Sequence, residues 1–272
     1  MYRCDCHLHT RFSFDGAPDS TAEAICRAAL DVGLNEITFT DHCDINGEVE
    51  HFYDRFDVAA AREAVMAARA QFSGRLVVNW GVELGQPHQY PAEAAALLAA
   101  GGFDFVLGSL HNLTAVPDYY YMRFDIMPDA LIHQLFARHL EELLALVRFP
   151  GVNALAHLTY PMRYIAGDGR TFDAMQHKPA FERLFAEMVA RDVALEVNYS
   201  PLRNGMPFTM PDEALVRLYR DCGGTRITLG SDAHKPADVA ACLEEAVDML
   251  QRCGFTSVVT YRGGQPYVHP LV

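Results

Sequence analysis

The amino-acid sequence predicts a single α/β domain whose parallel strands close into a barrel. Short apolar runs alternate with longer segments of helical periodicity along the chain. Repeated strand-then-helix units imply parallel strands joined by right-handed crossovers, and seven or eight such units favour a closed barrel over an open sheet. The length of 272 residues is ordinary for one such barrel, which runs to roughly 250 residues. No linker or low-complexity stretch divides the chain, so residues 1–272 are expected to form one domain.

The predicted strands are short apolar runs, at residues 2–6, 36–40, 76–80, 103–107, 152–156, 194–197, 226–229 and 257–260. The segments between them show helical periodicity, at residues 21–32, 58–72, 91–100, 128–147, 178–191, 212–222 and 236–252. Prolines stand where the first turn of four of these helices begins, at positions 91, 128, 211 and 236. In a barrel of this kind the chemistry lies at the carboxyl ends of the strands.

Charge and cysteine content exclude several classes of protein. The formal net charge is −13, and no run of Lys and Arg supplies a basic groove, so a general nucleic-acid binder is not expected. Seven scattered cysteines without paired spacing fit a reducing compartment. The chain shows no signal peptide and no apolar stretch of the roughly 20 residues needed to cross a membrane. We therefore expect a soluble, cytoplasmic protein without nucleic-acid or membrane partners.

Histidines and acidic residues follow six of the predicted strands within a few positions. These residues are His7, His9, Asp41, His42, Glu83, His111, His157, Asp232 and His234. Because the carboxyl ends of barrel strands meet at one end of the barrel, these side chains are expected to gather there. The remaining histidines lie in predicted helices or loops and are expected to be surface or structural residues: His51, His88, His133, His139, His177 and His269.

Two of these strand ends carry paired ligand-type residues. The two-residue period of a strand places His7 and His9 on one face together with Asp5, so that two imidazoles could bind one ion. Taken alone, this pair could equally be two ordinary polar residues. The pair Asp232 and His234 has fewer structural explanations, because burying unpaired polar groups costs about 1–3 kcal/mol each and coordination offsets that cost.

The type and number of these side chains indicate the metal. Imidazole and carboxylate without thiolate suit Zn, Mn or Fe better than Mg or Ca. There are more ligand-type residues than one ion can use, so two or three divalent ions are expected. Ions held roughly 3.5–4 Å apart can clamp a phosphoryl group during its displacement.

The motifs resemble those of the PHP (polymerase and histidinol phosphatase) superfamily, and within it the stand-alone histidinol-phosphate phosphatases. The matching stretches are residues 5–10 (DCHLHT), 38–42 (TFTDH), 81–85 (GVELG), 105–112 (FVLGSLHN), 156–161 (AHLTYP), 196–203 (EVNYSPLR) and 229–236 (LGSDAHKP). They cover nearly the whole chain in family order. The resemblance implies a distorted seven-stranded TIM-like (β/α) barrel with a trinuclear metal centre, and a role in histidine biosynthesis.

The resemblance also implies which residues bind each ion. One metal would take His7, His9, Glu83 and Asp232, and a second would share Glu83 and take His111 and His157. A third would take Asp15, His42 and His234. Related enzymes often have a histidine in the loop of Asp15, so the third site is where this chain departs from the family.

The implied activity is that of a metal-dependent phosphomonoesterase, most simply one that hydrolyses L-histidinol phosphate to L-histidinol and phosphate by attack of a metal-bound hydroxide. Asp232 or His234 would pass a proton to the leaving alkoxide. Arg163 and Arg203 follow barrel strands and are candidate phosphate ligands, although each taken singly is equally explained as a surface arginine.

Two further features concern the rest of the substrate. The tyrosines at 119–121 either wall the pocket and stack on a flat ring or form a packed loop. Asp44 and Glu48 are candidates to face a substrate ammonium group.

Three rival functions stay open from the sequence. The first is a PHP phosphoesterase that acts on nucleotides or nucleic-acid ends, which the lack of a basic groove disfavours. The second is a non-catalytic metal-binding barrel, which would be expected to have lost ligands. The third is an amidohydrolase-like enzyme, which commonly uses a carbamylated lysine; no lysine precedes Lys178.

Overall fold

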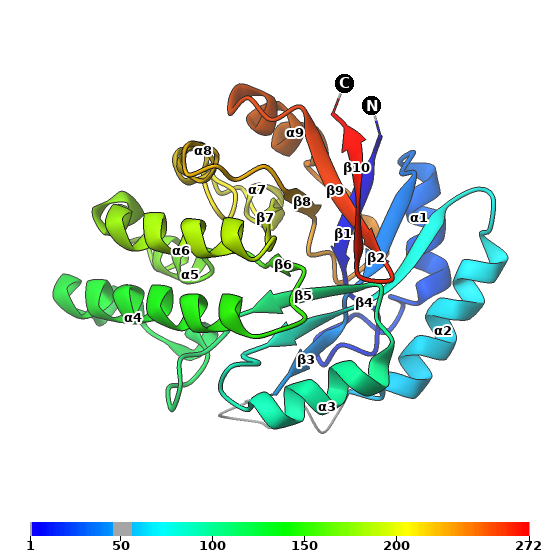
Figure 1. Ribbon diagram of the computed structural model, residues 1–272, viewed down its shortest axis with the longest axis horizontal. Helices are drawn as coiled ribbons and strands as arrows, with labels where there is room; N and C mark the ends of the chain where they lie inside the picture. Colours follow the sequence, from blue (N-terminus) through cyan, green and yellow to red (C-terminus); the bar gives the residue numbers. More distant parts are fainter. Residues whose placement is uncertain (1, 46–55, 272) are drawn as a thin grey trace.

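The computed structural model describes residues 2–45 and 56–271, and within these residues seven parallel strands form a nearly closed barrel surrounded by helices (Figure 1). The strands follow the order β1 (Cys4–Leu8), β2 (Glu36–Phe39), β4 (Val77–Gly85), β5 (Phe105–Ser109), β6 (Ala154–Leu155), β7 (Ala194–Asn198) and β8 (Ile227–Gly230). The chain just after β8 returns to β1, where the amide of Asp232 donates to the carbonyl oxygen of His7 at 3.0 Å. The predicted fold class is confirmed.

Strand β4 is longer than predicted and is shared by two neighbours. Its first part pairs with β2, and its last part pairs with β3 (His42–Asp44) and β5. The three residues of β3 are too few to show a pattern in the sequence. In this register His42 lies directly opposite Glu83, so the distortion of the sheet brings a histidine beside a carboxylate.

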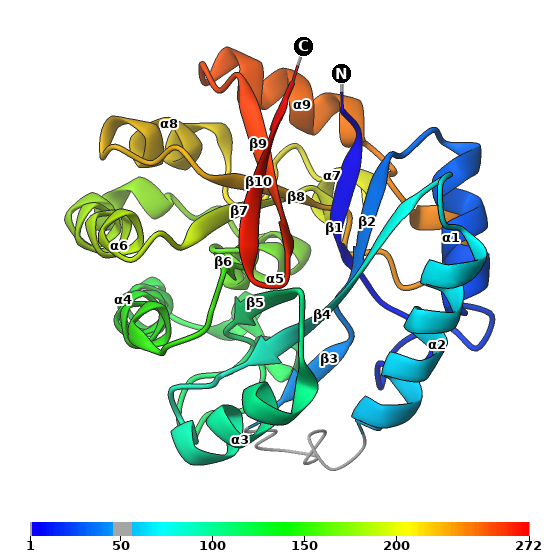
Figure 2. The same ribbon diagram turned by 45° about the vertical axis from the view of Figure 1, so that its right-hand side comes forward.

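Helices cover the outside of the barrel (Figures 1 and 2). They are α1 (Ala22–Asp31), α2 (Val58–Gln71), α3 (Pro91–Gly101), α4 (Asp129–Arg148), α6 (Lys178–Ala190), α8 (Glu213–Asp221) and α9 (Leu243–Arg252). Several begin at a capping side chain; Asp212, for example, accepts a hydrogen bond from the amide of Leu215 at 3.0 Å. Each predicted helix is present.

The prediction for the last helix was wrong at its start. Residues 236–252 were expected to be one helix, but Pro236–Asp238 form a separate 3₁₀ turn and α9 begins only at Leu243. Ala240 and Cys242 have φ angles of +55° and +71°. Because the left-handed region is incompatible with an α-helix, these two residues interrupt it.

Two short helices escaped the sequence prediction. They are α5 (Pro161–Gly167), which carries Arg163, and α7 (Ser200–Arg203), which ends at Arg203. Neither is long enough to show an apolar period, although both have proline in the first turn. Three 3₁₀ turns also lie in the loops: η2 (Tyr119–Tyr121), η3 (Phe124–Ile126) and η4 (Ala174–His177).

An antiparallel hairpin of β9 (Ser257–Arg262) and β10 (Gln265–Pro270) packs across the amino end of the strands (Figure 2). It is held by a buried carboxylate at the start of β2. Glu36 accepts hydrogen bonds from Arg262 of the hairpin and, at 2.7 Å each, from the Tyr2 hydroxyl and the Asn79 amide. A buried charge needs such partners.

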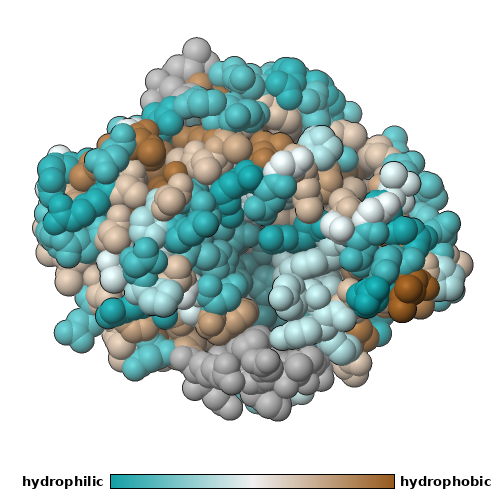
Figure 3. Space-filling model, turned by 180° about the vertical axis from the view of Figure 1, so that it is seen from behind, coloured by the Kyte–Doolittle hydropathy of each residue, from teal (hydrophilic) through white to brown (hydrophobic). Residues whose placement is uncertain are grey.

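The face seen from behind is hollowed at its centre, and the surface of the hollow is hydrophilic (Figure 3).

Among residues 2–45 and 56–271, no helix combines the length and the apolar character that a membrane span requires. All seven cysteines lie in the described ranges and are unpaired.

Candidate metal centre

Strand β1 delivers two histidines to the carboxyl end of the barrel. His7 and His9 are both fully buried, and their Nε2 atoms lie 3.7 and 3.3 Å from Oδ1 of Asp232, in the loop after β8. The alternation predicted for β1 holds for these two residues. Asp5 does not join them: its carboxylate accepts hydrogen bonds from the amides of Ser231 and Ala240, at 3.0 and 3.2 Å, and so anchors the loop that carries Asp232.

Glu83 of β4 is the centre of the site. Its Oε2 atom lies 3.1 Å from Nε2 of His7 and 2.9 Å from Nδ1 of His42. Its Oε1 atom lies 3.1 Å from His111 and 2.8 Å from His157. The two oxygens therefore face two different groups of histidines. Burial by itself would raise the pKa of Glu83, but the adjacent imidazoles hold it well below its usual value.

His111 and His157 follow β5 and β6 and meet over Oε1 of Glu83. Their Nε2 atoms are 3.3 Å apart, and both side chains are nearly fully buried. His157 has a φ of +20°, outside the ordinary regions for a residue with a side chain. Such strain persists only where the surroundings hold it, and it is common at functional sites.

A third group lies on the more open side of the cluster. The imidazoles of His42 and His234 stack on His9, with ring centroids 4.3 and 4.0 Å from it. Asp15 lies 3.1 Å from Nε2 of His234 and 3.7 Å from Nε2 of His42, and 44% of its side chain is exposed. His42 therefore faces Glu83 with one ring nitrogen and Asp15 with the other.

All nine side chains predicted as ligands thus form one connected cluster. Within it, three groups have ligand atoms within 4.8 Å of one another: His7, His9 and Asp232; His9, His42 and His234; and His42, Glu83 and His111. The last group places His42 with Glu83, whereas the family resemblance assigned it to Asp15 and His234. The two nitrogens of His42 are compatible with both arrangements.

The donor set fits divalent cations. Among the described residues, the buried ring nitrogens His9 Nε2, His42 Nδ1 and His234 Nε2 face carboxylate oxygens at 3.3, 2.9 and 3.1 Å but form no aligned hydrogen bond, and an unsatisfied buried polar atom is costly. The ligand-type atoms are nitrogen and oxygen, without a thiolate, which suits Zn, Mn or Fe.

Glu196 of β7 contacts two of the clustered histidine residues, and this supporting role was not predicted from the sequence. Its carboxylate lies 2.6 Å from Nδ1 of His7 and accepts the amide proton of His157 at 2.7 Å. A side chain at Gly230 would collide with both Glu196 and His7, so only glycine permits this close approach. A carboxylate that holds the second ring nitrogen of a ligand histidine orients the ring. The signal in the sequence was a lone acidic residue within an apolar strand.

Asp44 has the same kind of role, which corrects the expectation that it faces a substrate ammonium group. It is 4% exposed, and its Oδ2 atom lies 2.8 Å from Nδ1 of His111. Glu48, the other residue considered for that role, lies outside the described residues. Asp41 is also a supporting residue, since it accepts hydrogen bonds from Thr10 and Ser13.

Replacing Glu196 by glutamine is expected to weaken metal binding about 10- to 100-fold, the usual effect of losing such a support. The amide keeps the volume but cannot accept both hydrogen bonds as a carboxylate does. Metal content after dialysis against a chelator series measures the effect. Glu182→Gln, on the exposed face of α6, is the matched control; equal metal retention in the two variants would contradict the role of Glu196.

The two predicted phosphate ligands differ in their surroundings. Arg163 of α5 lies near the cluster, with Nη1 3.8 Å from Oδ2 of Asp232, and its guanidinium carbon is 5.9 and 5.5 Å from the ring centroids of Tyr160 and Tyr164. Its side chain is 27% exposed. A guanidinium between the metal ligands and solvent is well placed to meet an anion.

Arg203 is engaged with the main chain. It donates to the carbonyl oxygens of Ser231 and Asp232 at 2.8 and 3.3 Å, and its Nε lies 3.5 Å from Asp238. These contacts hold the loop that presents Asp232. Asn198 and Ser200 each approach Oδ2 of Asp232 at 3.4 Å.

Asp118, in the loop after His111, is a further acidic group near Arg163 that sequence reasoning missed. It accepts a hydrogen bond from the amide of Tyr120 at 2.7 Å. Burial raises the pKa of its carboxyl group, which the charge of His111 partly opposes. The negative charge of Asp118 in turn acts to raise the pKa values of Arg163 and Tyr164. Arg163 therefore experiences the negative charge of Asp118 in addition to that of Asp232.

The tyrosines that follow Asp118 divide between two roles. Tyr119 is fully buried, whereas Tyr120 and Tyr121 are 68% and 47% exposed. Tyr120 meets Tyr164 edge-on, with ring centroids 6.3 Å apart. Tyr119 therefore belongs to the packed loop, and Tyr120 borders the side of the site where Arg163 lies.

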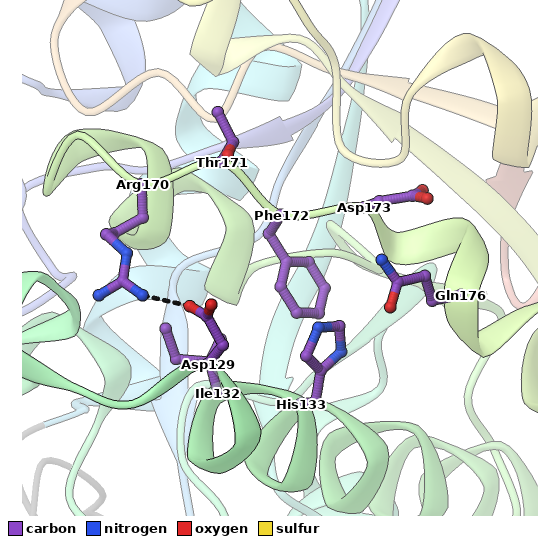
Figure 4. Close-up of a pocket in the computed structure, with 8 residues that line it drawn as sticks. All are labelled: Asp129, Ile132, His133, Arg170, Thr171, Phe172, Asp173 and Gln176. Atoms are coloured by element: carbon purple, nitrogen blue, oxygen red, sulfur yellow. Dashed lines mark hydrogen bonds and ion pairs between the residues drawn. The ribbon is translucent and has the colours of Figure 1, made fainter.

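A separate pocket of about 500 Å³ opens between α4 and the loop before η4 (Figure 4). Its lining includes the ion pair of Arg170 and Asp129 and the rings of His133 and Phe172. None of the nine clustered residues lines it. Despite its size, this pocket is not where the ligand-type side chains gather, so the chemistry is assigned to the cluster.

Comparisons with known proteins point to one family. The family model described as PHP domain matches residues 5–200. Histidinol-phosphatase from Lactococcus lactis is 23% identical over 267 residues, and the alignment covers 97% of this chain and 96% of that protein. A protein named "Probable histidinol-phosphatase" from Thermotoga maritima is 27% identical over 253 residues, with 92% of each chain covered.

Among solved structures, histidinol phosphate phosphatase from Lactococcus lactis, in complex with zinc, L-histidinol and phosphate, superposes with a TM-score of 0.80. The alignment covers 97% of this chain and 98% of that one at 21% identity. At this level of identity the likeness shows the shared fold.

Proposed function

Because this chain belongs to the PHP domain family, we propose that it is a metal-dependent phosphatase that hydrolyses L-histidinol phosphate to L-histidinol and phosphate. The observation that carries the proposal is the placement of Glu83, whose two oxygens face two groups of buried histidines. Such a shared carboxylate suits a site with more than one ion. The relatives named for histidinol phosphatase activity, matched over nearly their full length, support the choice of substrate.

The proposed cofactors are two or three divalent ions of Zn, Mn or Fe, held by His7, His9, Asp15, His42, Glu83, His111, His157, Asp232 and His234. When bound, such ions lower the pKa of water and neutralise charge on the phosphoryl oxygens. The protein's own part is to hold these ligands in a fixed, mostly buried arrangement. This preorganisation reduces the reorganisation needed during the reaction.

We propose that Asp232 passes a proton to the leaving alkoxide, and that His234 supplies this proton to Asp232. Asp232 turns Oδ1 toward His9 and His234, at 3.3 and 3.6 Å, and Oδ2 toward Arg163. It thus connects the ligand cluster with the side where an anion would be bound. His234 is more exposed, with 27% of its side chain accessible, and lies where a proton can reach solvent.

The alcohol part of the substrate would lie beside Asp118 and Tyr120. A carboxylate next to an exposed aromatic ring suits a cationic group and a flat ring. L-Histidinol phosphate carries both an amino group and an imidazole.

We also propose that the protein is cytoplasmic, because its seven cysteines show no paired spacing in the sequence.

Replacing Arg163 by alanine is expected to raise KM about 10- to 100-fold, since a hydrogen bond to a charged group is worth about 1.5–3 kcal/mol. Metal content should not change, because Arg163 approaches the cluster only at Oδ2 of Asp232, whereas Oδ1 is the oxygen that faces the histidines. Steady-state kinetics and metal analysis measure the two effects. Arg27→Ala, on the exposed face of α1, is the control, and an unchanged KM in Arg163→Ala would remove this residue from phosphate binding.

The alternative functions are weaker on specific grounds. Nucleotides or nucleic-acid ends would meet a chain with a net charge of −13, which opposes polyanion binding. A non-catalytic metal-binding barrel would not need all nine clustered positions to retain competent ligands.

The test is phosphate release from L-histidinol phosphate by metal-loaded protein, beside a panel of phosphomonoesters, nucleotides and a single-stranded oligonucleotide. We expect the highest kcat/KM for L-histidinol phosphate. Faster turnover of another monoester would overturn the substrate, and no turnover by protein that holds its metals would overturn the enzymatic function.

A further inference from the structure

His139, in the middle of α4, is buried at a distance from the ligand cluster but is linked to it. It was expected to be a surface or structural histidine. In the structure it is 1% exposed, and both of its ring nitrogens have partners. Nδ1 lies 3.1 Å from the hydroxyl oxygen of Tyr119, and Nε2 lies 3.1 Å from the carbonyl oxygen of Leu158. Helix α4, on the outside of the barrel, therefore contacts two of the loops that lie at the carboxyl end of the barrel strands.

The chemistry of these partners determines the protonation of the ring. A carbonyl oxygen only accepts, so Nε2 of His139 carries the proton and donates to Leu158. In a neutral imidazole Nδ1 is then an acceptor, and the hydroxyl of Tyr119 donates to it. Burial lowers the pKa of His139 to about 4, which agrees with a neutral ring at neutral pH. The three groups thus form one directed chain of hydrogen bonds.

Each end of this chain lies next to a candidate metal ligand. The amide of Tyr119 donates to the carbonyl oxygen of His111 at 3.3 Å, and Leu158 directly follows His157. The two ligands follow different strands, β5 and β6, and their Nε2 atoms lie 3.3 Å apart beside Glu83. His139 is therefore a bridge between the two loops that present these ligands.

A bridge is needed here because the His157 turn is strained. With φ at +20°, the backbone of His157 is outside its preferred regions, and the next carbonyl, that of Leu158, is buried and requires a donor. Tyr160 packs between the two loops, its ring centroid 5.0 Å from that of His111 and 4.8 Å from that of His157. Packing keeps the loops in contact, whereas the hydrogen bonds of His139 define their register.

We propose that His139 is a positioning residue that holds the loops of His111 and His157 at the spacing required to bind one ion together with Glu83. The inference rests on the proposed metal centre and adds to it a residue that makes no contact with the ions. It requires that loss of His139 lowers the affinity for one ion and leaves the ions at the other ligands in place.

The experiment uses the full chain, loaded with Zn²⁺ and dialysed against increasing concentrations of a chelator, with zinc per protein measured by mass spectrometry. His139→Leu removes both hydrogen bonds, and Tyr119→Phe removes one with little change of shape. His139→Gln can still donate to Leu158. The control is Leu143→Ala, since Leu143 is on the same helix and 1% exposed but makes no hydrogen bond to either loop. Unfolding temperatures are recorded for every variant.

We expect His139→Leu to release one ion at a chelator concentration about 10- to 100-fold lower than wild type does, as for other residues that support ligands. Tyr119→Phe should show a smaller shift of the same step, and His139→Gln should restore most of it. Should His139→Leu fail to fold, Tyr119→Phe and His139→Gln test the same step.

Two results would overturn the proposal. One is metal release from Tyr119→Phe and His139→Leu identical to that of wild type. The other is a shift in Leu143→Ala as large as that in His139→Leu at equal unfolding temperature, which would make the effect one of general stability. Wild-type protein that binds none of Zn, Mn and Fe would instead overturn the proposed function itself, and titrations of the wild type with these three metals distinguish that case.

Discussion

Glu83→Gln is expected to lower kcat by at least about a thousandfold, which corresponds to about 4 kcal/mol of barrier. The reason is that both carboxylate oxygens face imidazoles, within 3.1 Å of four different histidines. An amide offers one oxygen and one N–H₂ group, so one of the two groups of histidines would face a donor in place of an acceptor. The cluster would lose the ligand common to both groups.

Kinetics with L-histidinol phosphate and metal analysis of the purified variant test this prediction together. We expect less than the wild-type number of ions per chain, with no recovery of kcat when metal is added in excess. Glu93→Gln, an exposed glutamate at the start of α3, should behave as wild type. A Glu83 variant with full metal content and more than a tenth of wild-type activity would refute a central role for this carboxylate.

Asp232→Asn is expected to lower kcat about 100- to 1,000-fold, the range seen on removal of one catalytic polar group. Unlike Glu83, Asp232 meets the cluster with one oxygen only, so most of the metal should stay bound when metal is supplied in excess. The φ of Asp232 is +54°, a conformation that asparagine tolerates well, so the loop should keep its shape. The fall in kcat would therefore measure the contribution of the Asp232 carboxylate to the reaction.

The decisive measurement for Asp232→Asn is kcat at saturating metal. A value that stays low while metal content is normal supports a role in proton transfer. Recovery to the wild-type value would show that Asp232 acts only through metal affinity. Asp31→Asn, at the exposed end of α1, is the control for replacement of a carboxylate by an amide.

The fold and the membership of the cluster could be predicted because both depend on local patterns. Alternating apolar runs and helical periods indicate a barrel, and the carboxyl ends of its strands meet at one end. His7, Glu83 and His157 were recognisable because ligand-type side chains directly after buried strands are unusual. The strand prediction did not extend to β3, whose three residues carry no pattern of their own.

The supporting residues could not be predicted in the same way. Glu196 and Asp44 resemble other acidic residues in the sequence, and only their distances of 2.6 and 2.8 Å to ligand histidines identify them. The same holds for Arg163 and Arg203, which the sequence could not separate. One lies beside the cluster, and the other donates to two carbonyl groups of the loop after β8.

The class of fold, the family and eight residues of the cluster were predictable from strand ends, side-chain chemistry and motif order along the chain, and the ninth, Asp15, from the family resemblance. The arrangement of these residues could be seen only in the folded protein: His42 lies between two groups, Glu83 faces both, and His139 joins two loops from an outer helix. The physical reason is that hydrogen bonds act over about 3 Å between residues that can be far apart in sequence. Only the folded chain brings such partners together.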